Sequence, residues 1–522
     1  MTQVLEQRIA ALTANTACGE MFTIGRGIEK EGLRTTPVGE LSQSKHPHAL
    51  GSALTHPHIT TDYSEALLEF ITPVYRDAEG ALEFLEELHR FCYQNLGDEL
   101  IWSASMPCFL GGEDSIPIAE YGASNVAMLK HIYRVGLKWR YGKMMQTIAG
   151  IHYNFSLPDS FWPEYQQLLG DTSDLNAFQT SQYFSLIRNF RRYSWLILLL
   201  MGASPAMCSS FIQGAPHSLQ RMKGKALYLP HATSLRMGDL GYQSNAQADL
   251  YVCHNSLEDY VTTLGEGVNT SYLDYEKIGV KVNGEYRQLN SHLLQIENEF
   301  YSEIRPKRVT PSGRKPLHVL SDQGVEYIEV RNLDINPFEP LGLSAQQIHF
   351  VDCFLLYCLF EDSPLTDIEE YRRQLDNKAL VVNRGREPGL TLQRDANTAI
   401  TVQEWARQLM SGIDCVAQLM DEVQQTDKYS QACASERAKI EDLSLTPSAR
   451  ILNHLVEDDV SFFEFAMTRA NEHKDALTQQ SLSKERNTWF AQVAETSHQQ
   501  QADIEAADKI AFDQFLANYL AQ

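Results

Sequence analysis

Alternation of apolar and polar residues marks the strand candidates in the first two thirds of the chain. A period of two residues, which puts successive side chains on opposite faces of a sheet, occurs in residues 21–36, 66–74, 146–157 and 325–332. Apolar positions recur at helical spacing in residues 77–97 and 181–201. Strands separated by helices of uneven length predict an α+β fold.

Helical spacing dominates after about residue 345. It predicts helices over residues 344–360, 401–423, 447–469 and 483–520. The turn sequence REPG at 386–389 marks a candidate boundary. We therefore expect a helical C-terminal region.

Composition narrows the classes of function. Hydrophobic residues make up 43% of the chain and charged residues 21%, as in ordinary globular proteins. The net charge of −23 disfavours nucleic acid as a partner, because an acidic surface repels phosphate backbones. The longest apolar run, residues 195–203, is far shorter than the roughly 20 residues that span a bilayer, so we expect no membrane association.

The cysteines point to a reducing compartment. There are nine, irregularly spaced and with no CxxC pair, which favours neither a disulfide framework nor a zinc site. The N-terminal residues form an amphipathic pattern without the apolar core of a signal peptide. A cytoplasmic location is the prediction.

Polar residues of an unusual kind recur on the predicted strands. Those that share a strand face are Glu29 with Glu31, His152 with Asn154, and Glu329 with Arg331, while Glu69 aligns with Ile71. Taken singly, each pair is most simply the wet side of a half-buried strand. Glutamate is nevertheless depleted from strands, and lysine, serine and threonine are scarce at these positions.

If these faces converge, they predict a catalytic centre. Clustered carboxylates repel one another unless cations neutralise them, and Mg²⁺ prefers oxygen ligands and accompanies nucleotide phosphates. An arginine beside the metal could neutralise a transferring phosphoryl group. The chain lacks the G-x-x-x-x-G-K-[ST] loop and the dinucleotide fingerprint, so ATP held through metal–carboxylate contacts is the hypothesis.

Seven longer segments resemble one family, the bacterial glutamate–cysteine ligases (γ-glutamylcysteine synthetases) of the type found in enteric bacteria. They are RGIEKEGLR at 26–34, HPHALGSALTHPHITTDYSEALLEFITPV at 46–74, SMPCFL at 105–110, MQTIAGIHYNFSLP at 145–158, SLRMGDLGYQS at 234–244, LQIENEFYSEIRPKR at 294–308 and GVEYIEVRNLDINPF at 324–338. Seven such matches in order are far more specific than one short motif. They span about the first 380 residues, which predicts a catalytic domain over 1–380 and a helical region over 381–522 packed on or beside it.

The resemblance implies a fold and a reaction. The fold is that of the glutamine synthetase catalytic domain, a curved, mainly antiparallel sheet that forms a funnel-shaped active site with helices outside. The reaction is ATP-dependent ligation of the γ-carboxylate of L-glutamate to the amine of L-cysteine through a γ-glutamyl phosphate. Its products are γ-glutamylcysteine, ADP and phosphate, and it is the first step of glutathione biosynthesis.

The resemblance also implies the roles of individual residues. The metal ligands fall on Glu29, Glu31, Asp62, Glu69, His152 and Glu329, and the resemblance implies that they bind more than one Mg²⁺ ion, for which Mn²⁺ can substitute. Arg331 falls beside the transferred phosphate, which makes Glu329 and Arg331 the expected catalytic pair. The amino-acid pocket falls on Tyr133, Leu137, Ile148, Arg236, Tyr242 and Tyr301, with Tyr63 in the cysteine pocket. Family members are commonly inhibited by glutathione, which is expected to occupy the same pocket.

Simpler readings stay open for several of these residues. His152 alone is more often structural, Arg331 could serve only as the ion-pair partner of Glu329, and Tyr133, Leu137 and Ile148 could be plain core. Two further alternatives are γ-glutamyl transfer to another small amine and a nonenzymatic sensor of glutamate or nucleotide. The histidines at 46, 48, 56 and 58 are read as a loop. Asp62 is expected on a turn or bend before its strand, since strand alternation does not align it with Glu69.

Overall fold

The computed structural model describes residues 2–14, 19–212, 217–222, 224, 226–239, 245–247, 250–311 and 313–522. No helix in these ranges has the length and apolar character needed to cross a bilayer.

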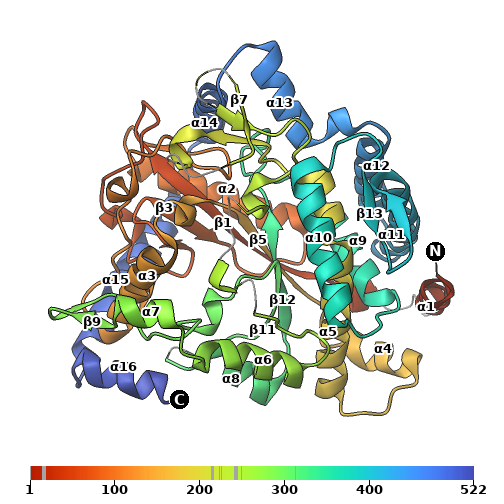
Figure 1. Ribbon diagram of the computed structural model, residues 1–522, viewed down its shortest axis with the longest axis horizontal. Coiled ribbons are helices and arrows are strands. Elements are labelled where there is room, and N and C mark those ends of the chain that lie inside the picture. Colours follow the sequence, from red (N-terminus) through yellow and green to blue (C-terminus); the bar gives the residue numbers. More distant parts are fainter. Residues whose placement is uncertain are drawn as a thin grey trace.

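The main sheet of the described residues has seven strands, and every pairing in it is antiparallel (Figure 1). Its order is β11 (Ile304–Lys307), β12 (Tyr327–Leu333), β5 (Ile151–Ser156), β1 (Gly25–Thr35), β3 (Leu67–Ile71) and β2 (Ile59–Thr61), with β4 (Leu100–Ile101) paired to β1. The central neighbours β12, β5 and β1 therefore come from distant parts of the chain.

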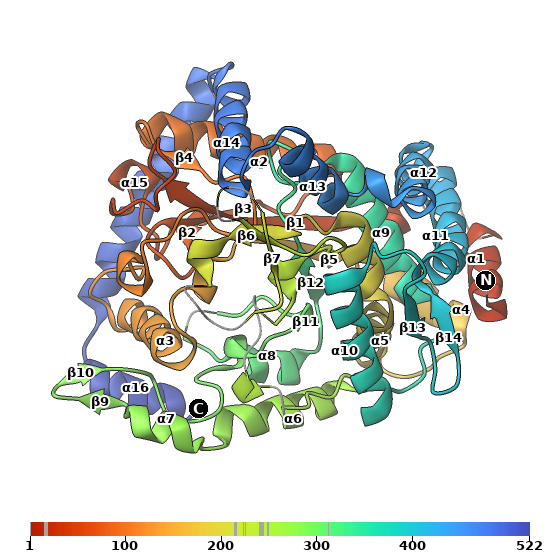
Figure 2. The same ribbon diagram turned by 45° about the horizontal axis from the view of Figure 1, so that its top comes forward.

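Helices cover one face of this sheet. α2 (Ala78–Asn95) packs against β1 and β3, and α5 (Leu175–Met201) packs against β11 and β12. α9 (Ala345–Phe360) reaches β5, where Tyr153 Oη donates a hydrogen bond of 2.6 Å to Asp352 Oδ1. α11 (Val402–Gln424) and α12 (Lys428–Glu441) pack on α9 farther from the sheet, as Figure 2 shows. The predicted polar residues of the strands lie on the opposite face of the sheet.

The remaining described elements surround this frame. The helices are α1 (Gln3–Ala14), α3 (Asn125–Tyr141), α4 (Phe161–Leu169), α6 (Leu257–Asn269), α7 (Leu273–Ile278), α8 (Pro316–Gln323) and α10 (Ile368–Arg384). Small antiparallel sheets are formed by β6 (Ala206–Cys208), β8 (Ala226–Tyr228) and β7 (Gln220–Arg221), by β9 (Lys281–Val282) and β10 (Glu285–Tyr286), and by β13 (Thr391–Gln393) and β14 (Ala399–Thr401).

Most predicted elements are present, but two predicted C-terminal helices are each two helices. The segment 447–469 contains α13 (Pro447–Glu457) and the start of α14 (Phe462–Thr478). Asp459 has a left-handed backbone (φ 50°), and Ser461 begins α14 with a capping box. The segment 483–520 contains α15 (Lys484–Ala507) and α16 (Phe512–Leu520), separated by a link whose ends have extended backbone. Helical periodicity continues across both breaks, so it could not reveal them.

The helical C-terminal region packs directly on the rest of the molecule. α14 contacts α2, and Leu409 and Phe490 belong to the same hydrophobic core as Phe155 of β5. A domain division at residue 380 stays a prediction.

A buried polar network joins the sheet to this helical region. Asp352 is fully buried and accepts hydrogen bonds from Arg26 Nε and Nη2 at 2.9 and 2.7 Å, in addition to the bond from Tyr153. Arg26 Nη2 also donates to Tyr429 Oη at 3.0 Å. The pairing of Arg26 in β1 with Asp352 in α9 therefore fixes the helical layer relative to the sheet.

Candidate active site

Strand register brings the polar positions together on the face of the sheet away from α2 and α9. Glu29 of β1 lies opposite His152 of β5, and Glu31 lies opposite Glu69 of β3. Asn154 of β5 lies opposite Glu329 of β12. Residues directly opposite each other in an antiparallel pair share a face, so the predicted polar pairs converge.

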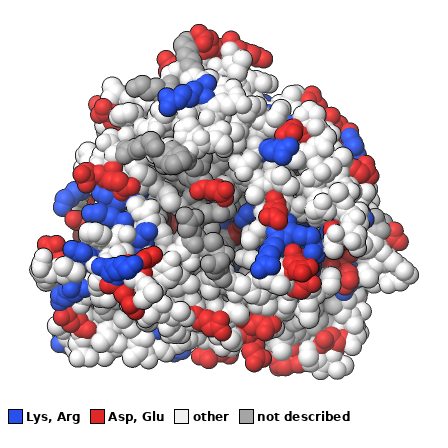
Figure 3. Space-filling view, in the orientation of Figure 1, with Lys and Arg blue, Asp and Glu red and all other residues white. Residues whose placement is uncertain are grey.

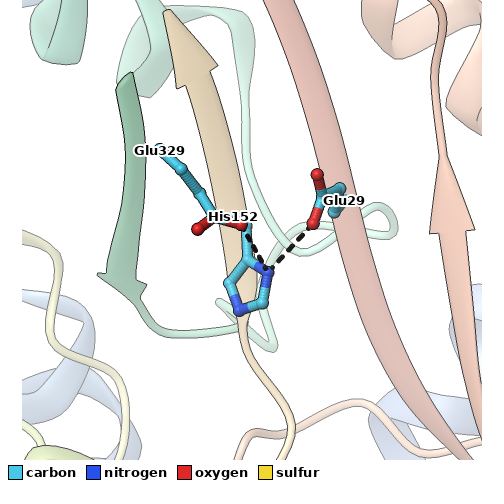
Figure 4. Close-up of side chains that lie close together, drawn as sticks. All are labelled: Glu29, His152 and Glu329. Carbon is cyan, nitrogen blue, oxygen red and sulfur yellow. Dashed lines mark hydrogen bonds and ion pairs between the residues drawn. The ribbon is translucent and has the colours of Figure 1, made fainter. Parts of the chain in front are cut away.

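The centre of the cluster is His152, which lies between two glutamates from different strands (Figure 4). His152 Nδ1 is 3.2 Å from Glu29 Oε2 and 3.8 Å from Glu329 Oε1, and its Nε2 is 3.8 Å from Glu31 Oε1. Asn154 Nδ2 donates to Glu29 Oε1 at 2.9 Å. His152 therefore contacts three of the predicted metal ligands.

Cations adjoin the β12 side of the cluster. Arg331 Nη1 donates to Glu329 Oε1 at 3.2 Å and lies 3.5 Å from His152 Nδ1. Lys307 Nζ of β11 is 3.5 Å from Glu329 Oε2. Although burial disfavours the charged carboxylate, Lys307, Arg331 and His152 hold the pKa of Glu329 well below its usual value.

Asp62 and Glu69 form the other side of the cluster. Asp62 lies on a bend between β2 and β3, as predicted. Its backbone carbonyl accepts hydrogen bonds from Tyr121 Oη at 2.9 Å and from Arg134 Nε at 2.5 Å, which fix the bend. Burial, together with repulsion from Glu29, Asp62 and Glu31, raises the pKa of Glu69 well above its usual value. A proton or a bound cation at Glu69 therefore relieves the repulsion on this side of the cluster.

A cavity of about 430 Å³ opens onto these residues. Its lining includes Glu29, Asp62, Glu69, His152, Glu329 and Arg331 from the predicted centre and Tyr63, Tyr133 and Leu137 from the predicted amino-acid pocket. Glu31 is not in the lining, because its Oε2 accepts a hydrogen bond of 2.6 Å from the Gly150 backbone N–H behind the cluster.

Comparison with known proteins agrees with this geometry. A family model described as glutamate–cysteine ligase matches residues 9–381, more than half of the chain. The chain belongs to the glutamate–cysteine ligase family. The predicted family and the ligase class are thereby confirmed, whereas assignment to the enteric-bacterial type stays a prediction.

Relatives of this family match the whole chain. The glutamate–cysteine ligases of Pseudomonas putida (strain W619) and Alcanivorax borkumensis are 49% and 48% identical over 100% and 99% of this chain and 99% of each relative. The crystal structure of the Francisella tularensis glutamate–cysteine ligase in complex with AMP superposes with a TM-score of 0.90 at 34% identity, over 96% of this chain and 98% of that one. The crystal structure of a bifunctional glutathione synthetase from Pasteurella multocida superposes with a TM-score of 0.74 at 25% identity, over 94% of this chain and 58% of that one. These matches confirm the predicted fold class.

The donor set fits a divalent cation in this family site. Ligand atoms of Glu29, His152 and Glu329 all lie within 4.8 Å of one another. Glu329 Oε2 is buried and, although Lys307 Nζ lies 3.5 Å away, it makes no hydrogen bond with any described residue, so it can serve as a ligand. Carboxylate oxygens are the ligands that Mg²⁺ prefers.

A smaller pocket of about 70 Å³ adjoins the cluster and contains the predicted Tyr301. It shares Tyr133, Leu137, Gln146 and Arg305 with the main cavity and is also lined by Gln247. The Gln247 side chain accepts from the Tyr301 backbone N–H at 3.0 Å and donates to the Glu299 backbone carbonyl at 2.9 Å. The Gln247 amide therefore pairs with both a carbonyl and an N–H of the backbone between Glu299 and Tyr301, and it fixes the segment that carries Tyr301.

The other predicted pocket residues have different surroundings. Arg236 is buried behind the cluster, where its Nη2 donates to the Arg331 carbonyl at 3.0 Å. Ile148 belongs to the hydrophobic core and lines neither cavity, which agrees with the simpler reading. Tyr63 has a buried hydroxyl without a hydrogen-bond partner among the described residues. Tyr242 lies outside the described residues. Direct substrate contacts by these four residues stay predictions.

Sequence reasoning missed several cavity residues. Arg305 and Lys307 alternate on β11 in the segment EIRPKR, so the rule that identified Glu329 and Arg331 would have found them. Lys130 and Arg134 of α3 stack on Tyr121 at 4.8 and 4.7 Å from its ring centre. Phe515 and Tyr519 of α16 also line the main cavity, and no local signal marks them.

We expect Mg²⁺ to bind more tightly as the pH rises, because the raised pKa of Glu69 makes protons compete with the metal for this carboxylate. One displaced proton gives at most about a tenfold gain in affinity per pH unit. The same shift lowers the stability of the metal-free protein as the pH rises from the ordinary glutamate pKa through the raised value. In that range the folded state binds a proton at Glu69 that the unfolded state has already lost, so removing protons favours unfolding. Calorimetric titration of Mg²⁺ at a series of pH values measures the first effect.

Glu69→Gln removes this titrating group and should give weaker binding that varies less with pH. Glu258→Gln, an exposed change of the same chemistry on α6, is the matched control. A wild-type affinity that does not vary with pH would refute this account of Glu69.

Proposed function

We propose that this protein catalyses ATP-dependent ligation of the γ-carboxylate of L-glutamate to the amine of L-cysteine, giving γ-glutamylcysteine, ADP and phosphate. This is the first step of glutathione biosynthesis. The observation that carries the proposal is the convergence of Glu29, His152 and Glu329 with Arg331 at one cavity, in a chain of the glutamate–cysteine ligase family.

The three substrates have three adjoining compartments. The carboxylate cluster with Lys307 and Arg331 suits Mg²⁺ and the triphosphate, and the pocket at Tyr301 suits the amino acids. A third pocket of about 330 Å³ shares Arg305 and Lys307 with the main cavity, and its apolar side chains suit a nucleotide base. Those side chains are Tyr260, Leu264, Val309, Leu317, Leu320 and Tyr327.

The charge distribution suits anionic substrates. Lys and Arg, with Asp and Glu among them, lie on both sides of the hollow near the centre of the face in Figure 3, although the chain carries a net charge of −23. Basic side chains beside a hollow attract anions and raise their local concentration.

In the first chemical step, an oxygen of the glutamate γ-carboxylate attacks the γ-phosphorus of ATP and ADP leaves. The guanidinium of Arg331 neutralises charge on the transferring phosphoryl group, and Lys307 does so from the adjacent strand. Mg²⁺, when bound, would shield the repulsion between the carboxylate and the triphosphate. Glu29, Glu69, Asp62, His152 and Glu329 are the residues that would hold it, with Glu31 supporting His152.

In the second step, the amine of cysteine attacks the γ-carbonyl carbon of the γ-glutamyl phosphate. The bond from that carbon to the phosphate oxygen breaks, phosphate leaves, and the amine loses a proton. Tyr133, Leu137 and the Tyr301 segment orient the two amino acids, and orientation alone lowers such a barrier substantially.

Other features of the proposal follow the resemblance to the family. The enzyme is expected in the cytoplasm, Mn²⁺ is expected to substitute for Mg²⁺, and glutathione is expected to act as a feedback inhibitor in the amino-acid pocket.

Arg331→Ala should lower kcat by about 10³-fold or more, because an arginine that stabilises a transferring phosphoryl group contributes that much. Glu329→Ala should abolish turnover as well. ADP release with glutamate, cysteine and Mg-ATP is the assay, with circular dichroism to confirm the fold. Arg407→Ala, which breaks an exposed ion pair to Glu441, is the control and should leave kcat unchanged. Near-wild-type turnover of Arg331→Ala would mean that Arg331 serves only to pair with Glu329. Absence of turnover in the wild-type protein would favour the sensor hypothesis.

Cysteine should be preferred over other small amines as acceptor. We expect its kcat/KM to exceed that of alanine and 2-aminobutyrate by about tenfold or more, the scale on which a fitted pocket separates small side chains. ADP release is measured with each amine at saturating glutamate and ATP. Equal values for cysteine and 2-aminobutyrate would favour transfer to another amine.

A further inference from the structure

The last helix of the chain reaches the active-site cavity. Phe515 and Tyr519 are four residues apart on α16, so they lie on one face of the helix, and both line the cavity that contains Glu29 and Glu329. Figure 1 shows α16 beside the β9–β10 hairpin, with the C-terminus near α8. The chain thus supplies a wall of the site from its final ten or so residues.

Polar contacts hold α16 to three separate elements. Asp513 accepts hydrogen bonds from Lys281 Nζ at 2.8 Å and Tyr286 Oη at 2.6 Å in the β9–β10 hairpin. Asp508, in the link before α16, accepts from the Asn125 backbone N–H at the start of α3 at 2.5 Å. Lys315, just before α8, donates to the Leu520 carbonyl at 3.2 Å. The position of α16 is therefore specified at both ends.

Apolar packing orients the helix. Phe512 and Leu516 form a small core with Ile132 of α3 and Leu289, separate from the main hydrophobic core. Tyr133, a predicted substrate-pocket residue, packs against this small core. Phe515 packs against the edge of this small core and, with Tyr519, also lines the cavity.

The cavity consequently has two unlike walls. The sheet wall carries the carboxylates, His152 and Arg331, whereas the other wall includes Leu129, Ile296 and the two aromatic side chains of α16, together with the cations Lys130 and Arg134 of α3. Phosphoryl transfer and amide formation use groups of the sheet wall and of the Tyr301 pocket. Phe515 and Tyr519 carry no charge to offer either step, and apolar side chains exclude water from the space they cover.

Water is the competing nucleophile in the proposed reaction. If water attacks the γ-carbonyl carbon of the γ-glutamyl phosphate, its oxygen joins that carbon and the bond to the phosphate oxygen breaks. Glutamate and phosphate are released with one proton to solvent, and ATP is spent without a peptide bond.

We propose that Phe515 and Tyr519 of α16 shield the γ-glutamyl phosphate from water, so that the C-terminal helix couples ATP cleavage to amide formation. This inference rests on the proposed function. It assigns the helix a positioning role, distinct from catalysis by the sheet wall.

The test compares ADP with γ-glutamylcysteine produced by the full-length variant Phe515→Ala/Tyr519→Ala. The ratio of ADP to γ-glutamylcysteine should rise from one in the wild type to clearly above one in the variant. Glutamate should also stimulate ATP hydrolysis by the variant when no amine is present. In H₂¹⁸O the variant should place ¹⁸O in the γ-carboxylate of glutamate, which identifies water attack on the acyl carbon. Phe515→Leu/Tyr519→Phe keeps the apolar bulk and should restore a ratio near one.

Gln514→Ala/Asn518→Ala alters the exposed face of the same helix and should keep a ratio of one. Phe515→Ala alone provides the milder test if the double variant does not fold, because Phe515 is only half-buried. A ratio of one in a folded variant, whatever its kcat, would overturn the inference, as would equal uncoupling by the control pair. Failure of the proposed function itself is separate, since wild-type protein would then release no ADP with glutamate and cysteine.

Discussion

Like charge confined to one face of an antiparallel sheet is the constraint on which this site depends. Register places Glu29, Glu31, Glu69 and Glu329 within one cluster, and burial makes their mutual repulsion strong. A folded protein can keep such a cluster only if protons, its own cations or bound metal offset the charge.

The negative charge is balanced differently on the two sides of the cluster, and this difference distinguishes their roles. On the β12 side, Lys307 and Arg331 keep Glu329 ionised. On the β3 side, burial and the repulsion of acidic neighbours raise the pKa of the Glu69 carboxyl, so it retains its proton above the usual value. One side therefore suits the phosphoryl group, and the other needs added cations. A metal-dependent transfer of phosphate to a carboxylate matches this division of charge.

Much of the site could be predicted from sequence because strand alternation is local. It identified the shared faces of Glu29 with Glu31 and of Glu329 with Arg331, and the family resemblance added Asp62. Pairing between β1, β5 and β12 could not be predicted from periodicity, since register depends on contacts between residues far apart in the chain. The breaks before Ser461 and after Ala507 were missed because capping and backbone conformation, not apolar spacing, end those helices. Phe515 reaches the cavity only through the packing of α16 on α3, which no local pattern encodes.

The central claim is that the converged carboxylates form one metal and phosphate centre. The most direct measurement is a crystal structure of the wild-type protein with Mg²⁺ and a non-hydrolysable ATP analogue. The account predicts an ion bound by carboxylates of the cluster, including Glu29 and Glu329, with Arg331 at the γ-phosphate. An ion and triphosphate bound elsewhere, with Glu29, His152 and Glu329 contacting only one another, would contradict it.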